Sequence, residues 1–512
     1  MNRPLDVLFV NADASAQAYQ DLSKDYAAIE PPTWCLLLAQ SCRAKGYGVA
    51  ILDCGAERLG EAEAVRRISE HKARLVCFVV YGQNPNSGTT NMIGANALST
   101  RLKAEHPDSI VCLVGSHVSA LPLEVLAHPA VDLVLLNEGV YALHNLLKTD
   151  LRGQDLLLVR GIGHKLQGVP QLNPPERVVP QERMDIDLPG YAWDLLPYKN
   201  RPLDLYRAHF WHAEFNHNLR TPFAAIYTSL GCKFKCDFCM INIVNRVDNA
   251  DGTVSANSPN MRFWSPEFIL GEFDKLAAMG VETIRLSDEM FFLNKNYYEP
   301  LLKGIVQRGH KFRMWSYSRI DTVRPNYLEL FRQAGIGWLA LGVEAASQVI
   351  RSEVSKGSFQ EVNIRQIAKT IQDAGLNIIS NYIFGFPDDT HETMQQTLDL
   401  ALELNTEMVN MYPCQALPGS PLYNTARANG WALPDSYAGY AFLSYESQPL
   451  PTRHLSAAEV LQFRDNAWQK YFTHEPFLAL VERKFGVQQR ANVEAMARIK
   501  LRRKLIEQQK PS

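Results

Sequence analysis

The sequence predicts an α/β protein in which a first, Rossmann-like sheet domain is followed by a partial barrel and a mainly helical C-terminal tail. Two observations lead to this fold class. Short apolar runs alternate with helical stretches from residue 5 to residue 136, and a second alternation runs from residue 223 to residue 413. Such alternation is typical of parallel sheets, because each parallel strand needs a crossover connection to reach the next one.

Length and composition limit the class of protein. The chain has 512 residues, of which 46% are hydrophobic and 21% charged, so it has the composition of a globular protein and room for about three domains. Its net charge of -2 gives no reason to expect a nucleic acid partner. It has no apolar run long enough to predict a membrane segment and no apolar signal peptide core. Nine cysteines indicate reduced thiols with a metal site, and we expect a cytoplasmic protein.

The first domain is expected at residues 1–150 as a doubly wound parallel sheet. Ligands of such sheets bind outside the carboxyl ends of the strands, where this sequence has loops rich in Gly, Ser and Asn. The fold alone does not name the ligand. The predicted strands lie at residues 5–11, 49–53, 75–80, 110–114 and 131–136, and the helices at 34–45, 62–71 and 90–105.

Residues 151–220 form a proline-dotted connector without sustained periodicity, which predicts an ordered but irregular linker. Aromatic side chains and histidines gather in its second half. They either pack between the domains or form a wall of a substrate pocket, and the sequence leaves both interpretations open.

The second domain is expected at residues 221–425 as a partial (β/α)6 barrel, open on one side. Active sites of barrels lie at the carboxyl ends of the strands, so the polar residues that end each apolar run are the site candidates. A polar insertion at residues 246–262 is either a lid or a surface excursion. The predicted strands are 223–228, 283–289, 312–319, 338–344, 377–385 and 408–413.

Three cysteines with C-x3-C-x2-C spacing follow the first strand of the second domain: Cys232, Cys236 and Cys239. Thiolates are soft ligands that suit iron–sulfur clusters. A [4Fe-4S] cubane needs four ligands, so this loop would leave one iron open for an exchangeable ligand. The alternatives are a zinc loop and three incidental thiols. Zinc requires a fourth Cys or His at short spacing, and none follows within several residues, whereas incidental clustering is disfavoured because the other six cysteines are scattered singly.

This motif, with Phe238 just before the last cysteine, resembles the radical S-adenosylmethionine (SAM) superfamily. The resemblance implies that the open iron chelates SAM and that the reduced cluster cleaves SAM to a 5′-deoxyadenosyl radical. It also implies that Arg319 pairs with the SAM carboxylate in a bidentate way, and that Asn381 replaces a small residue beside the adenine. The alternative for each acidic candidate is that it is an ordinary surface charge without a role in binding. The residues matching SAM-binding positions are Phe238, Ser287, Asp288, Glu289, Arg319, Glu344 and Asn381.

The first domain resembles the cobalamin-binding domain of B12-dependent radical SAM enzymes. The alternative is a degenerate sheet that binds no cofactor. The motif D-x-H-x-x-G, which supplies a histidine to cobalt in other B12 proteins, is absent, as it is in many members of this family, so the lower axial ligand is unassigned. The resemblance places the following residues around cobalamin: Asn11, Gly82, Ser87, Gly88, Thr89, Gly115, Ser116, His117, Glu138 and Gly139.

The tail at residues 426–512 is expected to be a helical extension. Its aromatic stretch at 431–445 either caps the open side of the barrel or simply packs on it, and a basic helix that includes residues 500–504 is expected to have a solvated face.

The resemblance implies a cobalamin-dependent radical SAM enzyme. The main hypothesis is a C-methyltransferase that acts on an unactivated carbon of a small-molecule or lipid-like substrate, through a 5′-deoxyadenosyl radical and methylcobalamin. An electron donor such as flavodoxin or ferredoxin would be its partner. The alternative is a cyclase or rearrangement enzyme without net methyl transfer. A third hypothesis, a sensor with the same cofactors, is disfavoured by the intact cysteine triad. The sequence does not name the substrate.

Overall fold

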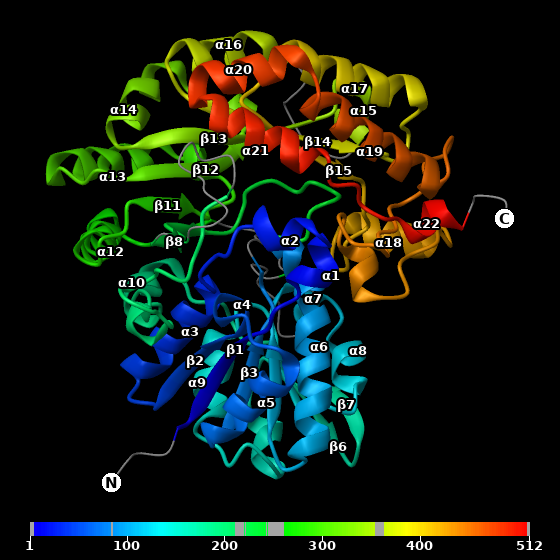
Figure 1. The fold of residues 1–512 in the computed structure, drawn as a ribbon. Coiled ribbons are helices and arrows are strands. Elements are labelled where there is room, and N and C mark those ends of the chain that lie inside the picture. The colour runs from blue at the N-terminus through cyan, green and yellow to red at the C-terminus, as the bar shows by residue number, and fades with distance from the viewer. Residues whose placement is uncertain are drawn as a thin grey trace.

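The computed structural model describes residues 5–82, 85–209, 220, 222–241, 243, 261–353 and 363–508. Two lobes face each other, each built on one sheet (Figure 1). The N-terminal sheet and its helices form the lower lobe, and the second sheet forms the upper lobe together with the C-terminal helices. Each run of alternating strands and helices in the sequence therefore becomes one sheet, and the expected fold class is confirmed.

The N-terminal sheet has seven strands in the order β2-β1-β3-β4-β5-β6-β7. The strand order reverses between β1 and β3, and this switch point is where ligands of doubly wound sheets bind. The principal helices of this lobe are α3 (Thr33–Ala44), α5 (Glu61–Glu70) and α6 (Gly88–Glu105). The parallel strands are β1 (Val7–Asn11), β2 (Val49–Asp53), β3 (Leu75–Val79), β4 (Val111–Val114) and β5 (Leu133–Leu135).

The connector contains regular structure that the sequence did not predict. Strands β6 (Ile162–Leu166) and β7 (Val169–Leu172) form an antiparallel hairpin that extends the N-terminal sheet beyond residue 150. Strand β6 reads Ile-Gly-His-Lys-Leu and β7 reads Val-Pro-Gln-Leu, and most of β7 is exposed. These sequences lack the apolar run that marks a buried parallel strand. The expectation of irregular structure was therefore wrong for residues 162–172.

The second sheet has six parallel strands in the order β15-β14-β13-β12-β11-β8. The order follows the sequence and the two edge strands do not pair with each other, so the sheet is an open partial barrel, as expected. Its strands are β8 (Phe223–Ile226), β11 (Thr283–Leu286), β12 (Arg313–Arg319), β13 (Ile336–Glu344), β14 (Asn377–Phe384) and β15 (Met408–Pro413). Its principal helices are α12 (Pro266–Ala278), α13 (Lys295–Arg308), α14 (Leu328–Gln333), α16 (Ile364–Asp373) and α17 (His391–Leu404).

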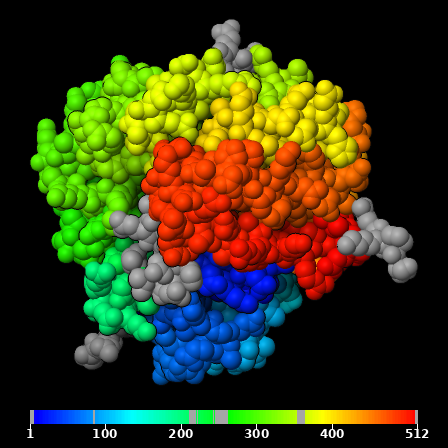
Figure 2. All heavy atoms as spheres, turned by 45° about the horizontal axis from the view of Figure 1, so that its top comes forward, coloured from blue at the N-terminus to red at the C-terminus, as the bar shows by residue number. Residues whose placement is uncertain are grey.

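The C-terminal tail lies along the barrel and reaches the N-terminal residues (Figure 2). The Arg464 side chain donates a hydrogen bond of 2.6 Å to the Met411 carbonyl of β15, and the Gln20 side chain donates one of 2.8 Å to the Leu443 carbonyl. The tail therefore joins the edge of the barrel to the N-terminal lobe. Its elements are α18 (Pro421–Ala428), η8 (Tyr437–Tyr440), α19 (Ala457–Phe472), α20 (Glu475–Phe485), α21 (Val487–Ala497) and α22 (Lys504–Glu507).

The basic C-terminal helix differs from its expectation. Helix α22 begins at Lys504, so the other basic residues at 500–503 lie before the helix. Arg503 is buried and pairs with Asp465 at 2.8 Å, so this charge holds the tail in place and does not face solvent. In the described part of the chain, no helix has the length and hydropathy needed to cross a membrane.

Candidate functional site

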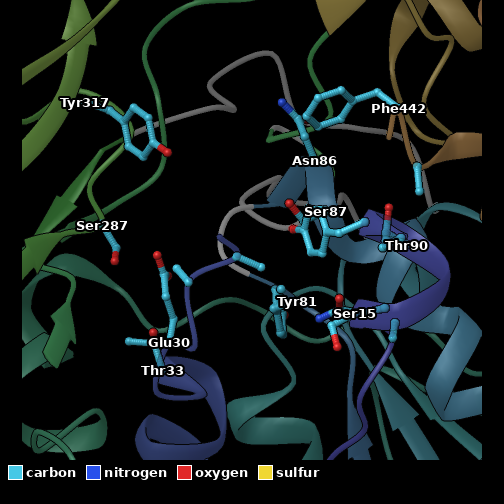
Figure 3. A pocket seen from close by; sticks show the side chains of 18 of the residues that line it. Ser15, Glu30, Thr33, Tyr81, Asn86, Ser87, Thr90, Ser287, Tyr317 and Phe442 are labelled. Carbon is cyan, nitrogen blue, oxygen red and sulfur yellow. The ribbon is translucent and has the colours of Figure 1, made fainter. Parts of the chain in front are cut away.

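A cavity of about 980 Å³ lies between the carboxyl ends of the two sheets (Figure 3). The N-terminal lobe contributes Asn11, Asp53 and Tyr81 to its wall, and the barrel contributes Ser287 and Tyr317 among others. Parallel strands place the ends of neighbouring strands at one edge of their sheet. Because the two sheets present these edges to each other, candidate residues that are far apart in the sequence share one chamber.

The three motif cysteines all line this cavity. The turn that leads into them uses Gly231 at a φ of 96°, a left-handed conformation that favours glycine. Within the described residues, no three His, Cys, Asp or Glu side chains are arranged as ligands of a single metal ion. Thiolates that share one ion must surround it, whereas cubane thiolates each bind a different iron and lie farther apart. Three thiols on one loop can each bind a different iron of a [4Fe-4S] cluster.

Side chains from both lobes hold the cysteine loop in place. The Arg319 guanidinium at the end of β12 lies 4.0 Å from the centre of the Phe234 ring. From the N-terminal lobe, the Asn86 side chain accepts a hydrogen bond of 3.0 Å from the Met240 backbone N–H. Burial is the main cause that raises the pKa of Cys232 and Cys239 to about 12. The thiolates therefore need a metal cluster to stabilise them.

Asp288 and Glu289, which follow β11, have different surroundings. The Asp288 carboxylate accepts hydrogen bonds from the Thr228 N–H at 2.9 Å, the Thr228 hydroxyl at 2.8 Å and the Ser229 hydroxyl. It is fully buried and does not line the cavity, so its place is that of an anchor for the strand before the cysteines. Its predicted contact with SAM is not supported by this position.

Glu289 and Ser287 line the cavity, and each has one buried oxygen atom without a hydrogen bond to the described part of the protein. Neither Glu289 Oε2 nor Ser287 Oγ has a hydrogen-bond partner among the described residues. Burial is the largest cause that raises the pKa of Glu289 to about 8. Buried polar atoms are costly unless they are paired, so these two atoms fit a ligand that brings donors such as an ammonium or a hydroxyl. SAM carries both groups.

The other predicted SAM residues also line the cavity: Phe238, Arg319, Glu344 and Asn381. The Arg319 Nε and Nη2 atoms pair with Asp321 at 3.0 and 2.7 Å, so this edge of the guanidinium is not available for the expected bidentate contact. The Asn381 side chain donates to the Leu341 carbonyl at 3.2 Å and accepts from Asn410 at 3.0 Å. Asn381 is therefore fixed between neighbouring strands. The roles of these residues stay predictions.

Among the predicted cobalamin residues, Asn11, Gly82 and Ser87 line the cavity at the β1/β3 switch point. A Cβ atom on Gly82 would lie 2.7 Å from the Ser87 Cβ, so glycine lets this loop fold tightly beside the chamber. This position, beside a chamber at the switch point, fits a large ligand on the sheet edge. The candidates outside the cavity lining are Gly88, Thr89, Gly115, Ser116, His117, Glu138 and Gly139.

Several of these other candidates contact the protein itself. A Cβ on Gly88 would lie 1.9 Å from the Ser116 hydroxyl, so the two loops pack against each other. His117 Nδ1 is 3.0 Å from the Thr89 hydroxyl, and burial lowers the pKa of His117 to about 4, which keeps the imidazole neutral. Glu138 lies 2.9 Å from Arg262, an ion pair that links the N-terminal lobe to the barrel.

Two family models match the chain: the B12 binding domain over residues 21–147 and the Radical SAM superfamily over residues 226–401. The chain belongs to the B12-binding radical SAM enzymes. This radical SAM enzyme is 24% identical to the uncharacterized methyltransferase PH0819 of Pyrococcus horikoshii, over 86% of its chain and 88% of that protein. It is also 24% identical to the anaerobic magnesium-protoporphyrin IX monomethyl ester cyclase of Rubrivivax gelatinosus, over 81% of its chain and 69% of that protein.

Two solved structures share the fold of this radical SAM enzyme. TsrM from Kitasatospora setae, solved with cobalamin and a [4Fe-4S] cluster bound, is 16% identical with a TM-score of 0.66, covering 97% of this chain and 99% of that one. OxsB, solved with aqua-cobalamin and SAM bound, is 15% identical with a TM-score of 0.65, covering 96% and 70%. At these identities the likeness establishes the shared fold.

Sequence reasoning missed a buried charge network in this radical SAM enzyme. Glu30 lines the cavity and accepts hydrogen bonds from Arg285 of β11 and from His209. Burial opposes ionisation of Glu30, but Arg285 and His209 outweigh it and hold the pKa of this carboxyl below its usual value. The available signal was Arg285 itself, because an arginine inside a buried strand must have a charged or polar partner.

Sequence reasoning also missed an aromatic lining of the chamber. Trp34 and Tyr81 stack with their ring centroids 4.3 Å apart at one side. Other aromatic side chains of the lining come from the N-terminal region, from two strands of the barrel and from the tail, and only the fold brings them together: Tyr19, Tyr317, Tyr412, Tyr440 and Phe442. The predicted connector aromatics at 210–217 lie outside the described residues.

Proposed function

We propose that this radical SAM enzyme transfers a methyl group to an unactivated carbon of a small molecule, with cobalamin and SAM on facing sides of one chamber. The observation that supports this most strongly is that the cysteine loop and the β1/β3 switch point open into the same cavity. When bound, the cluster with SAM supplies hydrogen abstraction from carbon, and cobalamin supplies the methyl group. The chain's own part is to hold the reacting groups close and to exclude water.

The residues divide this work between the lobes. Cys232, Cys236 and Cys239 would hold the cluster, and Ser287 with Glu289 would bind the polar atoms of SAM at the barrel side. The carboxyl edge of the N-terminal sheet, with Asn11, Gly82 and Ser87, would bind cobalamin. Strand ends are rigid, so both cofactors would be held in fixed positions relative to each other.

We propose a ring-bearing substrate for the space between them. The aromatic lining offers flat apolar surfaces. Burial raises the pKa of Tyr19 to about 12 and also raises that of Tyr317, so both phenols stay protonated and can hydrogen-bond a neutral polar group. Tyr440 and Phe442 come from the tail, which would make the tail part of the substrate wall. This supports the capping role of the tail over plain packing.

A cyclase or rearrangement activity is the second candidate, because one relative that aligns over most of the chain is named as a cyclase. A product that gains one methylene in mass supports methyl transfer. A product of changed connectivity without that gain supports the second candidate.

An acidic one-electron donor such as flavodoxin or ferredoxin is the proposed partner. Lys233 and Lys235, which flank Phe234 in the cysteine loop, are exposed. Exposed positive charges beside a redox site attract and orient an acidic partner. Because such encounters are electrostatic, the reduction rate should fall as ionic strength rises.

The test of the function is anaerobic reconstitution with iron, sulfide and hydroxocobalamin, beside a Cys232→Ala/Cys236→Ala/Cys239→Ala variant. The proposal expects cobalamin absorbance in both proteins, and cluster absorbance with reductive cleavage of SAM to 5′-deoxyadenosine only in the wild type. A wild-type protein that carries the cluster but no cobalamin would contradict methyl transfer.

A further inference from the structure

Asn86 crosses from one lobe to the other. It lies in η1 (Pro85–Ser87), between β3 and α6 of the N-terminal lobe, and its side chain lines the cavity (Figure 3). Its Oδ1 atom accepts the Met240 backbone N–H at 3.0 Å, and its Nδ2 atom lies 3.7 Å from the Cys239 Sγ. A residue of the B12-binding lobe thus contacts a cluster ligand of the barrel.

The Met240 contact fixes the direction of the Asn86 amide. A backbone N–H requires an acceptor, and only the oxygen of a carboxamide can accept. Asn86 Oδ1 and Nδ2 both lie 3.7 Å from Cys239 Sγ, but a thiolate that binds iron has no proton to donate, so only the NH₂ group can form a hydrogen bond with it. The geometry therefore places a hydrogen-bond donor on Cys239 Sγ.

A donor at this sulfur has an electrostatic consequence for a bound cluster. Hydrogen bonds to cluster sulfurs, net charge and solvent exposure set the reduction potential of an iron–sulfur centre. The reduced cluster carries one more negative charge than the oxidised cluster, so a donor stabilises the reduced form more. Beside Cys239, Phe238 packs against Phe386 with 5.7 Å between the ring centroids, and a hydrogen bond that protein shields from water is stronger than one in solvent.

We propose that Asn86 raises the reduction potential of the cluster through its hydrogen bond to Cys239. This inference rests on the proposed function, because it needs the cluster to be bound. Asn86 is a positioning residue that acts through the thiolate. The step that it favours is the transfer of one electron from a flavodoxin- or ferredoxin-class donor to the oxidised cluster, in which no bond to carbon forms or breaks. The B12-binding lobe would in this way set how readily the barrel's cluster is reduced.

The test is a redox titration of the reconstituted holoenzyme, with the reduced cluster followed by electron paramagnetic resonance (EPR) in the absence of SAM. Asn86→Leu removes both the donor and the acceptor. Asn86→Asp keeps an acceptor for Met240 but puts a carboxylate at the sulfur; the titration is run at about pH 8.5, far above the ordinary carboxyl pKa. Asn91→Leu is the matched control, since it removes another amide from the same cavity wall.

We expect the reduction potential of the cluster to be highest in the wild type, lower in Asn86→Leu and most negative in Asn86→Asp. The Leu variant should be about tenfold harder to reduce, which corresponds to about 59 mV for a one-electron couple. Asn91→Leu should match the wild type. If Asn86→Asp behaves like the wild type, the side chain only holds the loop through Met240, and the proposal is overturned.

The iron and sulfide content of each protein distinguishes a failure of the proposed function from a failure of the proposed role of Asn86. A wild-type protein that assembles no [4Fe-4S] cluster overturns the proposed function together with this inference. A wild-type protein with a full cluster, and with the same potential in all variants, overturns the role of Asn86 and leaves the proposed function standing.

Discussion

At the scale of single residues, Asp288 and Glu289 show how neighbours in one motif acquire different tasks. Asp288 is satisfied by the backbone and side chains just before the cysteine loop, whereas Glu289 faces the chamber with an oxygen that the described protein leaves unpaired. The sequence predicts both as SAM ligands, because a motif identifies strand ends but not the direction of each side chain. The cysteine positions needed no such detail, since their spacing alone specifies the ligand loop.

The raised pKa of Glu289 predicts proton release when SAM binds. Its pKa of about 8, due mainly to burial, means that the carboxyl is mostly protonated at pH 7 in the SAM-free protein. The positively charged sulfonium of SAM in the same cavity favours the carboxylate and lowers that pKa, so binding at pH 7 should release up to one proton from Glu289, in addition to any proton that the SAM ammonium loses when its nitrogen binds iron. Calorimetry of SAM binding in buffers of different ionisation enthalpy measures this number.

Two controls accompany the proton measurement. At about pH 9.5 the Glu289 carboxyl is already ionised, so its share of the released protons should disappear in the wild type. Glu289→Gln should release up to one proton fewer than the wild type at pH 7, should match it at about pH 9.5, and should bind SAM more weakly. Equal proton release by Glu289→Gln and the wild type at pH 7 would contradict the assignment.

At the scale of elements, the strands and helices predicted from apolar periodicity are found, while elements held by tertiary contacts are not predicted. The β6–β7 hairpin mixes polar with apolar residues and is partly exposed, and α22 is a single turn. The segment around Arg503 was expected as a solvated helix because basic residues are usually exposed. Its burial depends on Asp465 of α19, a partner 38 residues away that no local pattern reveals.

The buried Arg503 predicts that the tail depends on one ion pair. Its guanidinium pairs with Asp465 and donates to the carbonyls of Phe442 at 3.0 Å and Ser444 at 2.8 Å. Arg503→Ala removes one of the two arginines that pair with Asp465, Arg464 being the other at 2.8 Å, and takes this donor from the two carbonyls, which should destabilise the protein by about 3 kcal/mol. The aromatic stretch before it should become sensitive to limited proteolysis.

Arg502→Ala is the matched control for that experiment. Arg502 is 70% exposed and pairs with Glu507, so its loss should change the free energy of unfolding by less than about 1 kcal/mol. Denaturant unfolding of the two variants measures the difference. Equal stability of both would contradict the idea that Arg503 anchors the tail.

At the scale of the whole molecule, the site is the space between two lobes, and the contacts that join the lobes also shape it. Glu30 with Arg285, Glu138 with Arg262, and Asn86 with Met240 each connect the N-terminal lobe to the barrel. The order of the two domains and their fold class were predictable from the sequence. Their mutual orientation was not, because these pairs join residues that lie up to 255 positions apart.

The Glu30–Arg285 pair predicts that the integrity of the lobe interface depends on one carboxylate. Arg285 is fully buried, and Glu30→Gln would remove its ion pair with the Glu30 carboxylate. The free energy of unfolding of the variant, measured with denaturant, should be lower by about 3 kcal/mol. The variant should also lose cobalamin faster during gel filtration. Asp194→Asn, which breaks the partly exposed pair with Arg43, should leave both properties unchanged. The same cobalamin retention in Glu30→Gln as in the wild type would contradict this role.

The EPR spectrum of cobalamin in the cob(II) state tests most directly whether one cavity holds both cofactors. It is recorded first with the cluster oxidised and then with the cluster reduced. Two paramagnetic centres in one cavity interact magnetically, so we expect the cobalt signal to broaden or split when the cluster is reduced. The triple cysteine variant should show an unperturbed cobalt signal under both conditions. A wild-type protein with full cobalamin and cluster content, but with a cobalt signal that cluster reduction leaves unchanged, would contradict the shared chamber.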